Sequence, residues 1–456
     1  MEDAKESSTN LPCEAIVTEK NSSKSGSSAA SRRRRRRRRT PVSSSSPPAA
    51  LEGEEASAEA KLTTKRRSPG KRDSSQDSRE RVVSGILELG WKGKGGKGGN
   101  GYLRQLDKNL EPQKDDPIVP QASIRKFNLK AGSVLVGKAS GAGAPTMRYV
   151  ESVDGMEMSE HRRRRDFKKL TVIDPDYQYE VGSCEQDGQV SMRILDLLCP
   201  IGRGQRALLV APPRSGKTML MQQIARAMQE NYPDVHLIVL LIDERPEEAT
   251  YWRREVENGE VFVSTMDETP KNHVRLSELV QARAERLVES GKDVLILLDS
   301  ITRLARAHNH QTGGKGKTMS GGLDSRAMAK PKNFFGCARN TENAGSLTMV
   351  GTTLVDTGSK MDQIIFEEFK GTGNMEIVLD RRLADRRIFP AIAVDRSGTR
   401  KEEKLRTRAT QHKVDILRRV LSRMRPLEAM ELMVSRLAQF GTNQEFLGAF
   451  SMDDVE

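Results

Sequence analysis

The sequence predicts an α/β domain with a parallel sheet, preceded by a small β-barrel and a disordered N-terminal tail. Three observations support this prediction. From about residue 190, continuous apolar runs alternate with segments of helical periodicity. Before them, short β-like segments are separated by glycine turns. Residues 1–80 are rich in Ser, Ala, Arg, Glu and Pro and hold few large apolar side chains.

The tail, residues 1–80, carries a run of eight arginines, Arg32–Arg39. The whole chain has a formal net charge of +13, and a surplus of this size favours a polyanionic partner, nucleic acid before an anionic membrane. The tail either holds nucleic acid without sequence preference or only keeps the chain in solution, and the sequence leaves both interpretations open.

Cysteine usage and the N-terminus indicate a cytoplasmic protein. The four cysteines, Cys13, Cys184, Cys199 and Cys337, form no CxxC pair, which is typical of reduced thiols and unlike a zinc site. The polar start Met1–Asn10 lacks the apolar core of a signal peptide. No run approaches the roughly 18 apolar residues of a membrane span, so we expect no membrane partner.

We expect the small barrel over residues 81–155 and a linker over residues 156–190. Short strands with glycine turns are typical of such barrels, and they are predicted at Gly101–Arg104, Ser133–Gly137 and Arg148–Val150. The linker contains the basic run Arg162–Arg165, whose charge we interpret as solvation.

Residues 191–456 form the predicted α/β domain. Its central strands should be largely continuous apolar runs, because a parallel sheet is covered on both faces. The runs that fit are Ala207–Val210, Leu237–Ile242, Val294–Leu298 and Leu347–Val350. Apolar residues recur at helical spacing from Leu276 to Leu287, so strands and helices alternate as in βαβ units.

A phosphate-binding loop is predicted at Ala211–Thr218, between a strand that ends at Val210 and an amphipathic helix. Backbone N–H groups at a helix start cradle phosphates, and Gly216 lets the backbone come close. Lys217 supplies a charge to the β and γ phosphates, and Thr218 places a hydroxyl on Mg²⁺. The segment therefore predicts an ATP site with Mg²⁺ as cofactor.

Acidic positions complete the predicted site. Asp299 ends the run Val294–Leu298, where a Mg²⁺-binding aspartate belongs, although a strand-end aspartate can also be a cap. Asp243 and Glu244 follow the run that ends at Ile242, and a carboxylate there can orient or deprotonate the attacking water. Glu244 is the candidate and Asp243 the alternative; an acidic turn before a helix is the other interpretation.

The motifs around these positions resemble those of the bacterial transcription termination factor Rho family. The phosphate loop shares the family's Ala-Pro-Pro start, and later segments follow in the family's order: Leu241–Glu248, Leu298–Arg306, Asp356–Asp362, Glu368–Met375 and Arg396–Glu403. The resemblance runs from about residue 81 to the C-terminus and is most specific from residue 195 onward. It implies a RecA-like core behind an OB-fold (cold-shock-like) domain. It also implies a homohexameric ATPase that moves 5′ to 3′ on single-stranded RNA and releases it from the RNA polymerase elongation complex.

The resemblance further implies roles for single residues at the ATP site. Glu244 matches the catalytic glutamate, Arg303 the residue between nucleotide and RNA loop, and Arg400 the arginine finger for the ATP of a neighbouring subunit. With Lys217 and Asp299 they form the expected catalytic set. Nucleotide contacts are expected from Gly202, Arg203, Gly204, Gln205, Arg206, Ala207, Arg214, Ser215, Gly216, Lys217, Thr218, Met219, Arg245 and Phe389, the last by stacking on adenine.

Loops of the α/β domain and the face of the barrel are expected to contact RNA. The resemblance places Lys317 in a channel loop, Asn309–Gly322, and Lys360 in a second one, Thr357–Lys360. Both patterns are also typical of flexible surface loops. On the barrel, the resemblance implies RNA contacts from Tyr102, Arg104, Arg125, Lys126, Arg148 and Tyr149.

The barrel departs from the family's pattern at three positions. Asn100 and Ile118 stand where the family has aromatic residues, and Met147 stands where it has a glutamate. We therefore expect a broader base choice than the family's preference for cytosine.

Two other functions share some of these features. A rotary ATP synthase or export-ATPase subunit has the same core but lacks a basic single-strand-binding barrel and loops with residues such as Lys317 and Lys360. A nucleic-acid-binding protein could use ATP only as an assembly switch, but such a switch needs neither the base Glu244 nor the finger Arg400.

Overall fold

The structure is a computed structural model that describes residues 80–90, 99–141, 143–183, 189–312, 320–324 and 326–449. The predicted tail up to residue 79, with Arg32–Arg39, and the channel residue Lys317 lie outside the described residues. Among the described residues, no helix has the length and apolar character that crossing a membrane requires.

The first elements form a closed five-stranded barrel, which confirms the predicted small barrel and is the arrangement of an OB-fold. β3 pairs with both β2 and β5, and this pairing closes the order β3-β2-β1-β4-β5. Side chains that point inward, among them Leu87, Leu103 and Leu135, are fully buried. The elements are β1 (Arg81–Leu89), β2 (Gly101–Arg104), β3 (Ile118–Val119), α1 (Gln121–Lys126), β4 (Val134–Ser140), β5 (Thr146–Val153) and β6 (Met156–Glu157).

Short elements connect the barrel to the larger domain. β7 pairs with β14 (Asn340–Thr341), and β8 pairs with β9, so the connection is fixed to the larger domain by backbone hydrogen bonds. The elements are α2 (Met158–Arg163), η1 (Phe167–Lys169), β7 (Val172–Ile173), β8 (Gln178–Tyr179), η2 (Val181–Ser183), α3 (Gln189–Leu198) and β9 (Ile201–Gly202).

The larger domain is built on a seven-stranded sheet with the order β12-β11-β13-β15-β10-β16-β17, which confirms the predicted α/β fold. Neighbouring strands are parallel except β17, which is antiparallel to β16. The strands are β10 (Arg206–Ala211), β11 (His236–Glu244), β12 (Gly259–Thr265), β13 (Val294–Asp299), β15 (Leu347–Leu354), β16 (Met375–Val378) and β17 (Gly398–Thr399).

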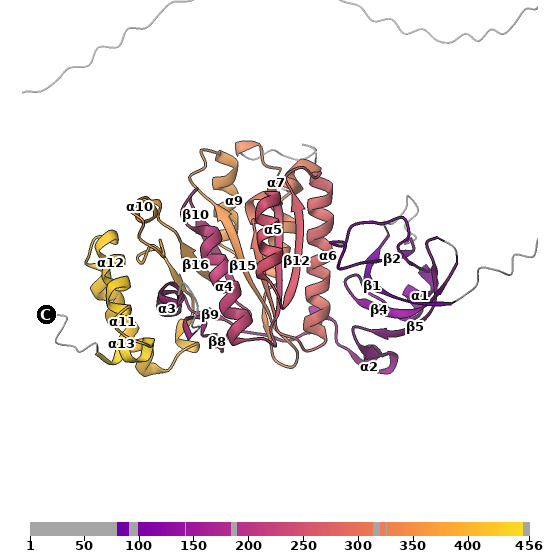
Figure 1. Ribbon diagram of the computed structural model, residues 1–456, viewed down its shortest axis with the longest axis horizontal. Helices are drawn as coiled ribbons and strands as arrows, with labels where there is room; N and C mark the ends of the chain where they lie inside the picture. Colours follow the sequence, from indigo (N-terminus) through magenta and orange to yellow (C-terminus); the bar gives the residue numbers. More distant parts are fainter. Residues whose placement is uncertain are drawn as a thin grey trace, which may run out of the picture. The chain divides into compact units, whose positions relative to one another are not determined.

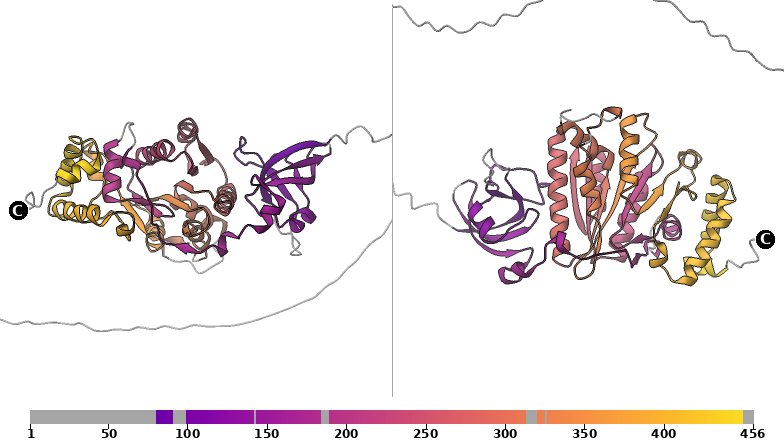
Figure 2. Two further views of the ribbon diagram at one scale, coloured as in Figure 1. Left: turned by 90° about the horizontal axis from the view of Figure 1, so that it is seen from below. Right: turned by 180° about the vertical axis from the view of Figure 1, so that it is seen from behind.

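Helices cover both faces of this sheet (Figures 1 and 2). Successive strand residues point to opposite faces, so Leu209 packs with α3, α4 and α5, whereas Leu208 packs with α6 to α9. This double burial explains why the strands read as continuous apolar runs. The helices are α4 (Lys217–Asn231), α5 (Pro246–Glu255), α6 (Pro270–Glu289), α7 (Ile301–Thr312), η3 (Ser320–Gly322), α8 (Ala329–Gly336), α9 (Lys360–Lys370), α10 (Arg381–Asp385), η4 (Glu402–Lys404), α11 (Arg408–Ser422), α12 (Pro426–Leu437) and α13 (Asn443–Ala449).

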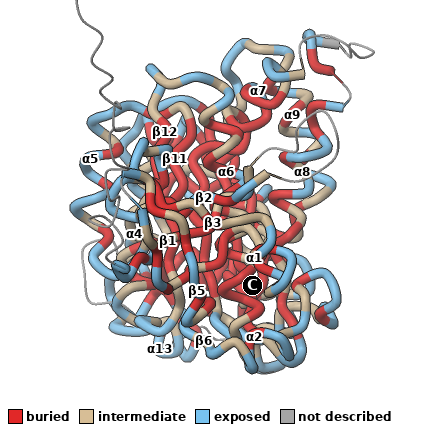
Figure 3. The backbone as a smooth tube through the Cα atoms, turned by 90° about the vertical axis from the view of Figure 1, so that its right-hand side faces the viewer, coloured by how far each residue is buried: buried red, intermediate tan, exposed pale blue. Residues whose placement is uncertain are grey.

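The barrel contacts the edge strand β12 and the helix α6. The side chain of Asn109 donates to the carbonyl O of Val263 at 2.6 Å and accepts from its N–H at 2.9 Å, as a neighbouring strand would. At the end of α6, the fully buried carboxylate of Glu289 meets Lys130 of the barrel at 3.2 Å and Arg164 of the linker at 3.4 Å. Buried residues follow the strands of the barrel and of the sheet (Figure 3). The contacts of Asn109 and Glu289 connect these two parts of the chain.

Candidate functional site

The predicted phosphate loop connects β10 to α4. Gly216 has a φ of +87° and directly precedes Lys217, the first residue of α4. A Cβ at Gly216 would lie 3.1 Å from the ring of Phe389, so glycine allows both the turn and the close approach of that ring. Ser215 is buried, and its hydroxyl donates to the carbonyl O of Pro212 at 2.8 Å, which closes the loop. The loop therefore presents its N–H groups at a helix start, as phosphate binding requires.

Lys217 begins α4, after the loop that follows β10, and Asp299 is the last residue of β13. The ammonium of Lys217 is 2.7 Å and 2.5 Å from the two carboxylate oxygens of Asp299. Thr352, on β15 between them, donates its hydroxyl to Asp299 at 2.8 Å. Asp299 is 1% exposed, so its carboxylate lies away from solvent, beside the phosphate loop, where electrostatic interactions are strong.

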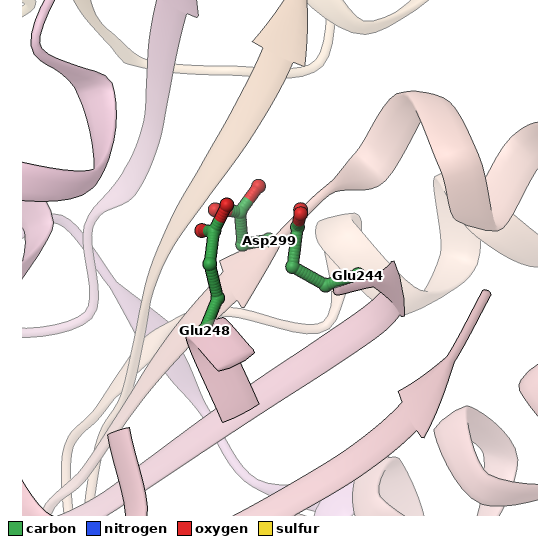
Figure 4. Close-up of side chains that lie close together, drawn as sticks. All are labelled: Glu244, Glu248 and Asp299. Atoms are coloured by element: carbon green, nitrogen blue, oxygen red, sulfur yellow. The ribbon is translucent and has the colours of Figure 1, made fainter. Parts of the chain in front are cut away.

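Three carboxylates gather at this point: Glu244, Glu248 and Asp299 (Figure 4). One oxygen of each lies within 4.8 Å of the others. Oxygen donors at this spacing are the kind of set that Mg²⁺ prefers. Glu248 was not among the site residues predicted from the sequence. Its signal was its position in the first turn of α5, four residues after Glu244, which turns the side chain back over the strand end.

The pKa of Glu244 lies above its ordinary value. Burial raises the pKa of Glu244 first, and the neighbouring charge of Asp299 raises it further, whereas Lys217 and Arg303 oppose the shift. A carboxylate with a raised pKa is a stronger base in its ionised form. Asp243, the alternative, points toward Arg303 at 3.3 Å and lies outside the carboxylate cluster.

The helix α7 connects these carboxylates to a loop predicted to contact RNA. Near its start, Arg303 lies 3.7 Å from Glu244 and also donates to the carbonyl O of Asp243. One turn later, Arg306 pairs with the buried carboxylate of Asp362 at 2.5 Å. Asp362 also accepts from the hydroxyl of Thr357 at 2.6 Å, so it holds the loop Thr357–Lys360 against α7.

The described ends of the two predicted channel loops lie side by side. Asn309 donates to the carbonyl O of Gly322 at 3.1 Å, and a Cβ at Gly321 would lie 3.0 Å from the backbone N of Met361. Lys360 is exposed at the start of α9 and lines a pocket of about 380 Å³ beside Thr357.

Some predicted nucleotide contacts lie far from the phosphate loop of the same chain. Gly202–Ala207 sits at the amino end of β10, where Gln205 donates to Asn374 at 2.8 Å. From Arg206 to the loop, β10 spans roughly 16 Å. Arg400 is exposed at this same end, and its N–H donates to Asn374 at 2.9 Å. Within one chain, Gly202–Ala207 and Arg400 therefore lie at the end of β10 opposite the phosphate loop. This position agrees with the expectation that Arg400 serves the ATP of a neighbouring subunit.

The other predicted contacts lie near the phosphate loop. Arg214 is exposed with a φ of +62°, and Thr218 is half-buried in the first turn of α4. Met219 is 52% exposed, and Arg245 is exposed as the cap of α5 directly after Glu244.

Predicted RNA-binding residues lie on the outer surface of the barrel. Tyr102 is 37% and Tyr149 is 60% exposed. Arg125, Lys126 and Arg148 are also exposed, so these side chains can reach a ligand in solution.

Arg104 differs from the other predicted RNA-binding residues. It is 8% exposed, its Nε lies 2.5 Å from Glu88, and its Nη1 binds Asp116. Burial and the two carboxylates on its Nε and Nη1 thus set it apart from the exposed residues expected to contact RNA. Its guanidinium lies 5.0 Å from the ring of Tyr102, and in this position it supports the aromatic side chain.

The three departures from the family pattern have different structural settings. Met147 is 1% exposed and packs inside the barrel, so this change affects the interior and not the outer surface. Ile118 is half-buried opposite Tyr102 on the neighbouring strand. Asn100 is exposed and accepts from the N–H of Gln121 at the start of α1 at 3.2 Å.

The comparison with family models matches residues 191–399 to the nucleotide-binding domain of the ATP synthase alpha/beta family. Among solved structures, an ATPase from the type III secretion system of pathogenic bacteria matches with a TM-score of 0.50 at 21% identity, covering 67% of this chain and 84% of that one. At this identity the likeness shows the fold alone. It confirms the RecA-like core that the sequence predicted.

Sequence relatives extend over most of the chain. Transcription termination factor Rho of Aquifex aeolicus is 46% identical over 384 residues, which is 82% of this chain and 86% of the relative. The Rho proteins of Haemophilus influenzae and Escherichia coli K12 are 49% and 48% identical, and each match covers 76% of this chain and 84% of the relative. On the strength of these matches and of the site geometry, the chain belongs to the transcription termination factor Rho family and is an ATP-hydrolysing P-loop ATPase.

Proposed function

We propose that this chain forms a hexameric, RNA-dependent ATPase that moves 5′ to 3′ along single-stranded RNA and releases the transcript from RNA polymerase in the bacterial cytoplasm. One observation carries the proposal. The helix α7 contacts Glu244 through Arg303 and the loop Thr357–Lys360 through Arg306 and Asp362. One helix would thus connect ATP hydrolysis to RNA contact.

The ATP site supplies the parts that phosphoryl transfer needs. Lys217 and the loop N–H groups would hold the phosphates, and Thr218, Asp299 and Glu248 would hold Mg²⁺, which neutralises charge on the phosphates. Glu244 is placed to orient and deprotonate the attacking water. Phe389, whose ring packs on Gly216, is the aromatic surface for adenine.

Arg400 supports the assembly of several copies. It lies at the opposite end of β10 from its own phosphate loop, so it serves as an arginine finger only when a neighbouring subunit brings its ATP site to it. Gly202–Ala207 lies at the same end and would approach the same neighbour. A finger of this kind contributes about 10³–10⁵ in rate.

The test is steady-state ATP hydrolysis with no nucleic acid, with poly(C), with poly(U) and with single-stranded DNA. The proposal expects strong stimulation by RNA alone. The ratio of poly(C) to poly(U) stimulation reports base preference, which we expect to be broad because Asn100 and Ile118 replace aromatic residues. Hydrolysis that ignores every nucleic acid would contradict the proposal and favour a rotary or export ATPase or an assembly switch.

A further inference from the structure

A basic pocket lies where the barrel meets the linker, and the functions described so far leave it unexplained. Its volume is about 280 Å³. Four of the residues around it are lysines or arginines, one is a histidine, and none is acidic. The lining residues are Lys126, Phe127, Asn128, Lys130, His161, Arg162 and Arg164.

Carboxylates behind the pocket fix part of its basic wall. Arg164, with 3% of its side chain exposed, binds Asp154 through Nη1 at 2.7 Å and approaches Glu289 through Nε at 3.4 Å. Its Nη2 is buried and has no hydrogen-bond partner among the described residues. Lys130 is held by Asp166 and Glu289. The side chain of Arg164 is therefore held in place by carboxylates, and its Nη2 can still donate a hydrogen bond.

Two further cations at the pocket are not neutralised in this way. Lys126 and Arg162 are exposed, and neither forms an ion pair within the part of the chain that the structure describes. The nitrogen of Lys126 lies 5.1 Å from the ring centre of Phe127, so its stem follows the pocket wall. The pocket thus has a surplus of positive charge and attracts an anion.

His161 adds a hydrogen-bond acceptor beside these donors. It is 5% exposed, and its Nε2 lies 3.1 Å from the carbonyl O of Phe127. A carbonyl oxygen only accepts, so Nε2 carries the proton. Burial, and then the charge of Arg164, lower the pKa of His161, which keeps the ring neutral near pH 7. Its Nδ1 is therefore an acceptor, and it is buried without a partner among the described residues.

We propose that this pocket binds one nucleotide unit of an RNA backbone, with Lys126, Arg162 and Arg164 on the phosphate and His161 accepting a hydrogen bond from the ribose 2′-hydroxyl. Cationic donors beside a single neutral acceptor match a phosphate beside a hydroxyl, and the hydroxyl distinguishes RNA from DNA. The inference rests on the proposed function in taking RNA as the ligand. It extends the RNA path from α1 of the barrel onto the linker run Arg162–Arg165.

The first test compares Arg162→Gln with Arg163→Gln in the full chain. Both substitutions remove one exposed charge from α2, but only Arg162 lines the pocket. Binding of a fluorescent single-stranded RNA is measured by anisotropy over a range of salt concentrations. Arg162→Gln should weaken binding by about three- to tenfold at low salt and reduce the slope of log K against log salt by about 0.7. Equal effects of the two substitutions would overturn the proposal.

The second test addresses His161 with an RNA and its 2′-deoxy counterpart of the same sequence. His161→Phe removes the acceptor, and His161→Asn retains one. In the folded His161→Phe variant the preference for RNA should fall by about two- to tenfold, the size of one hydrogen bond, and His161→Asn should retain more of it. An unchanged preference in both variants would refute the assigned hydroxyl contact. Arg162→Gln keeps the phosphate contact testable if both histidine variants fail to fold.

Failure of this inference is distinguishable from failure of the proposed function. If RNA stimulates ATP hydrolysis by the unaltered chain and Arg162→Gln binds RNA as Arg163→Gln does, only the pocket assignment is wrong. If RNA stimulates nothing in the unaltered chain, the proposed function itself fails.

Discussion

The ATP site and the barrel surface predicted to bind RNA hold their candidate side chains in opposite ways. At the ATP site, Asp299 and Glu244 are 1% and 3% exposed, and each is held by charged neighbours on other elements. On the barrel, Tyr102 and Tyr149 are 37% and 60% exposed on a rigid scaffold. Phosphoryl transfer requires fixed geometry in a site of low polarity, whereas stacking on bases requires accessible rings. Arg104 combines both, since it is buried and supports an exposed tyrosine.

The largest effect expected from this comparison is on turnover. Glu244→Gln keeps the size of the side chain and removes its basicity, so ATP hydrolysis should fall by about 10²–10⁴ while ATP still binds. Single-turnover hydrolysis and binding of a fluorescent ATP analogue measure the two quantities. Retained RNA release by this variant would mean that ATP acts as a switch and not as the fuel of a motor.

A smaller effect is expected at the barrel. Tyr102→Ala should weaken RNA binding by about 1–3 kcal/mol, the contribution of one stacked base, without changing the ATPase rate at saturating RNA. Tyr251→Ala in α5 is the matched control, because Tyr251 is also 37% exposed. RNA affinity that falls equally in both variants would place the stacking surface elsewhere.

A further effect is expected on the coupling between RNA binding and ATP hydrolysis. Arg306→Gln breaks the pair with Asp362 that holds the loop Thr357–Lys360 to α7. RNA stimulation of ATP hydrolysis should fall by about 2- to 30-fold, whereas hydrolysis without RNA should change less. Lys330→Gln, which breaks an exposed pair with Glu278, serves as the control. Unchanged stimulation would show that α7 does not transmit the signal through Arg306.

The smallest expected effect is a shift in pH dependence. Glu248 is one of the charges that raise the pKa of Glu244, so Glu248→Gln should lower that pKa. The base must be deprotonated, and the rate falls as pH drops through its pKa, so the acidic limb of the pH–rate profile should move to lower pH. The control is Glu247→Gln, an exposed neighbour. An acidic limb that does not move would contradict this effect of Glu248 on Glu244, whereas a loss of activity that excess Mg²⁺ restores would support the proposed role of Glu248 as a Mg²⁺ ligand.

The two regions also differ in how far the sequence predicts them. The phosphate loop, Asp299 and Glu244 follow from local patterns, because each lies where a strand ends and the next segment begins. Glu248 was missed since only the turn of α5 brings it back to the strand end. The burial of Arg104 depends on Glu88 and Asp116, which come from other segments of the barrel. No local pattern reports such long-range pairs.

The position of Gly202–Ala207 illustrates a second limit. The family resemblance implies that it contacts nucleotide, but β10 carries the chain across the sheet between this segment and the phosphate loop. The pairing of Asn109 with Val263 was equally hidden, since 154 residues separate them. The pocket beside His161 also depends on segments that meet only in the folded chain.

The amide of Asn109 has a consequence for solubility. It offers one donor and one acceptor to Val263 and so pairs with the outer edge of β12 at that residue, on the last strand of that side of the sheet. An open strand edge recruits other chains and promotes aggregation. In a protein proposed to gather six copies in a defined ring, a blocked edge leaves the intended subunit contacts without competition from stray strand pairing.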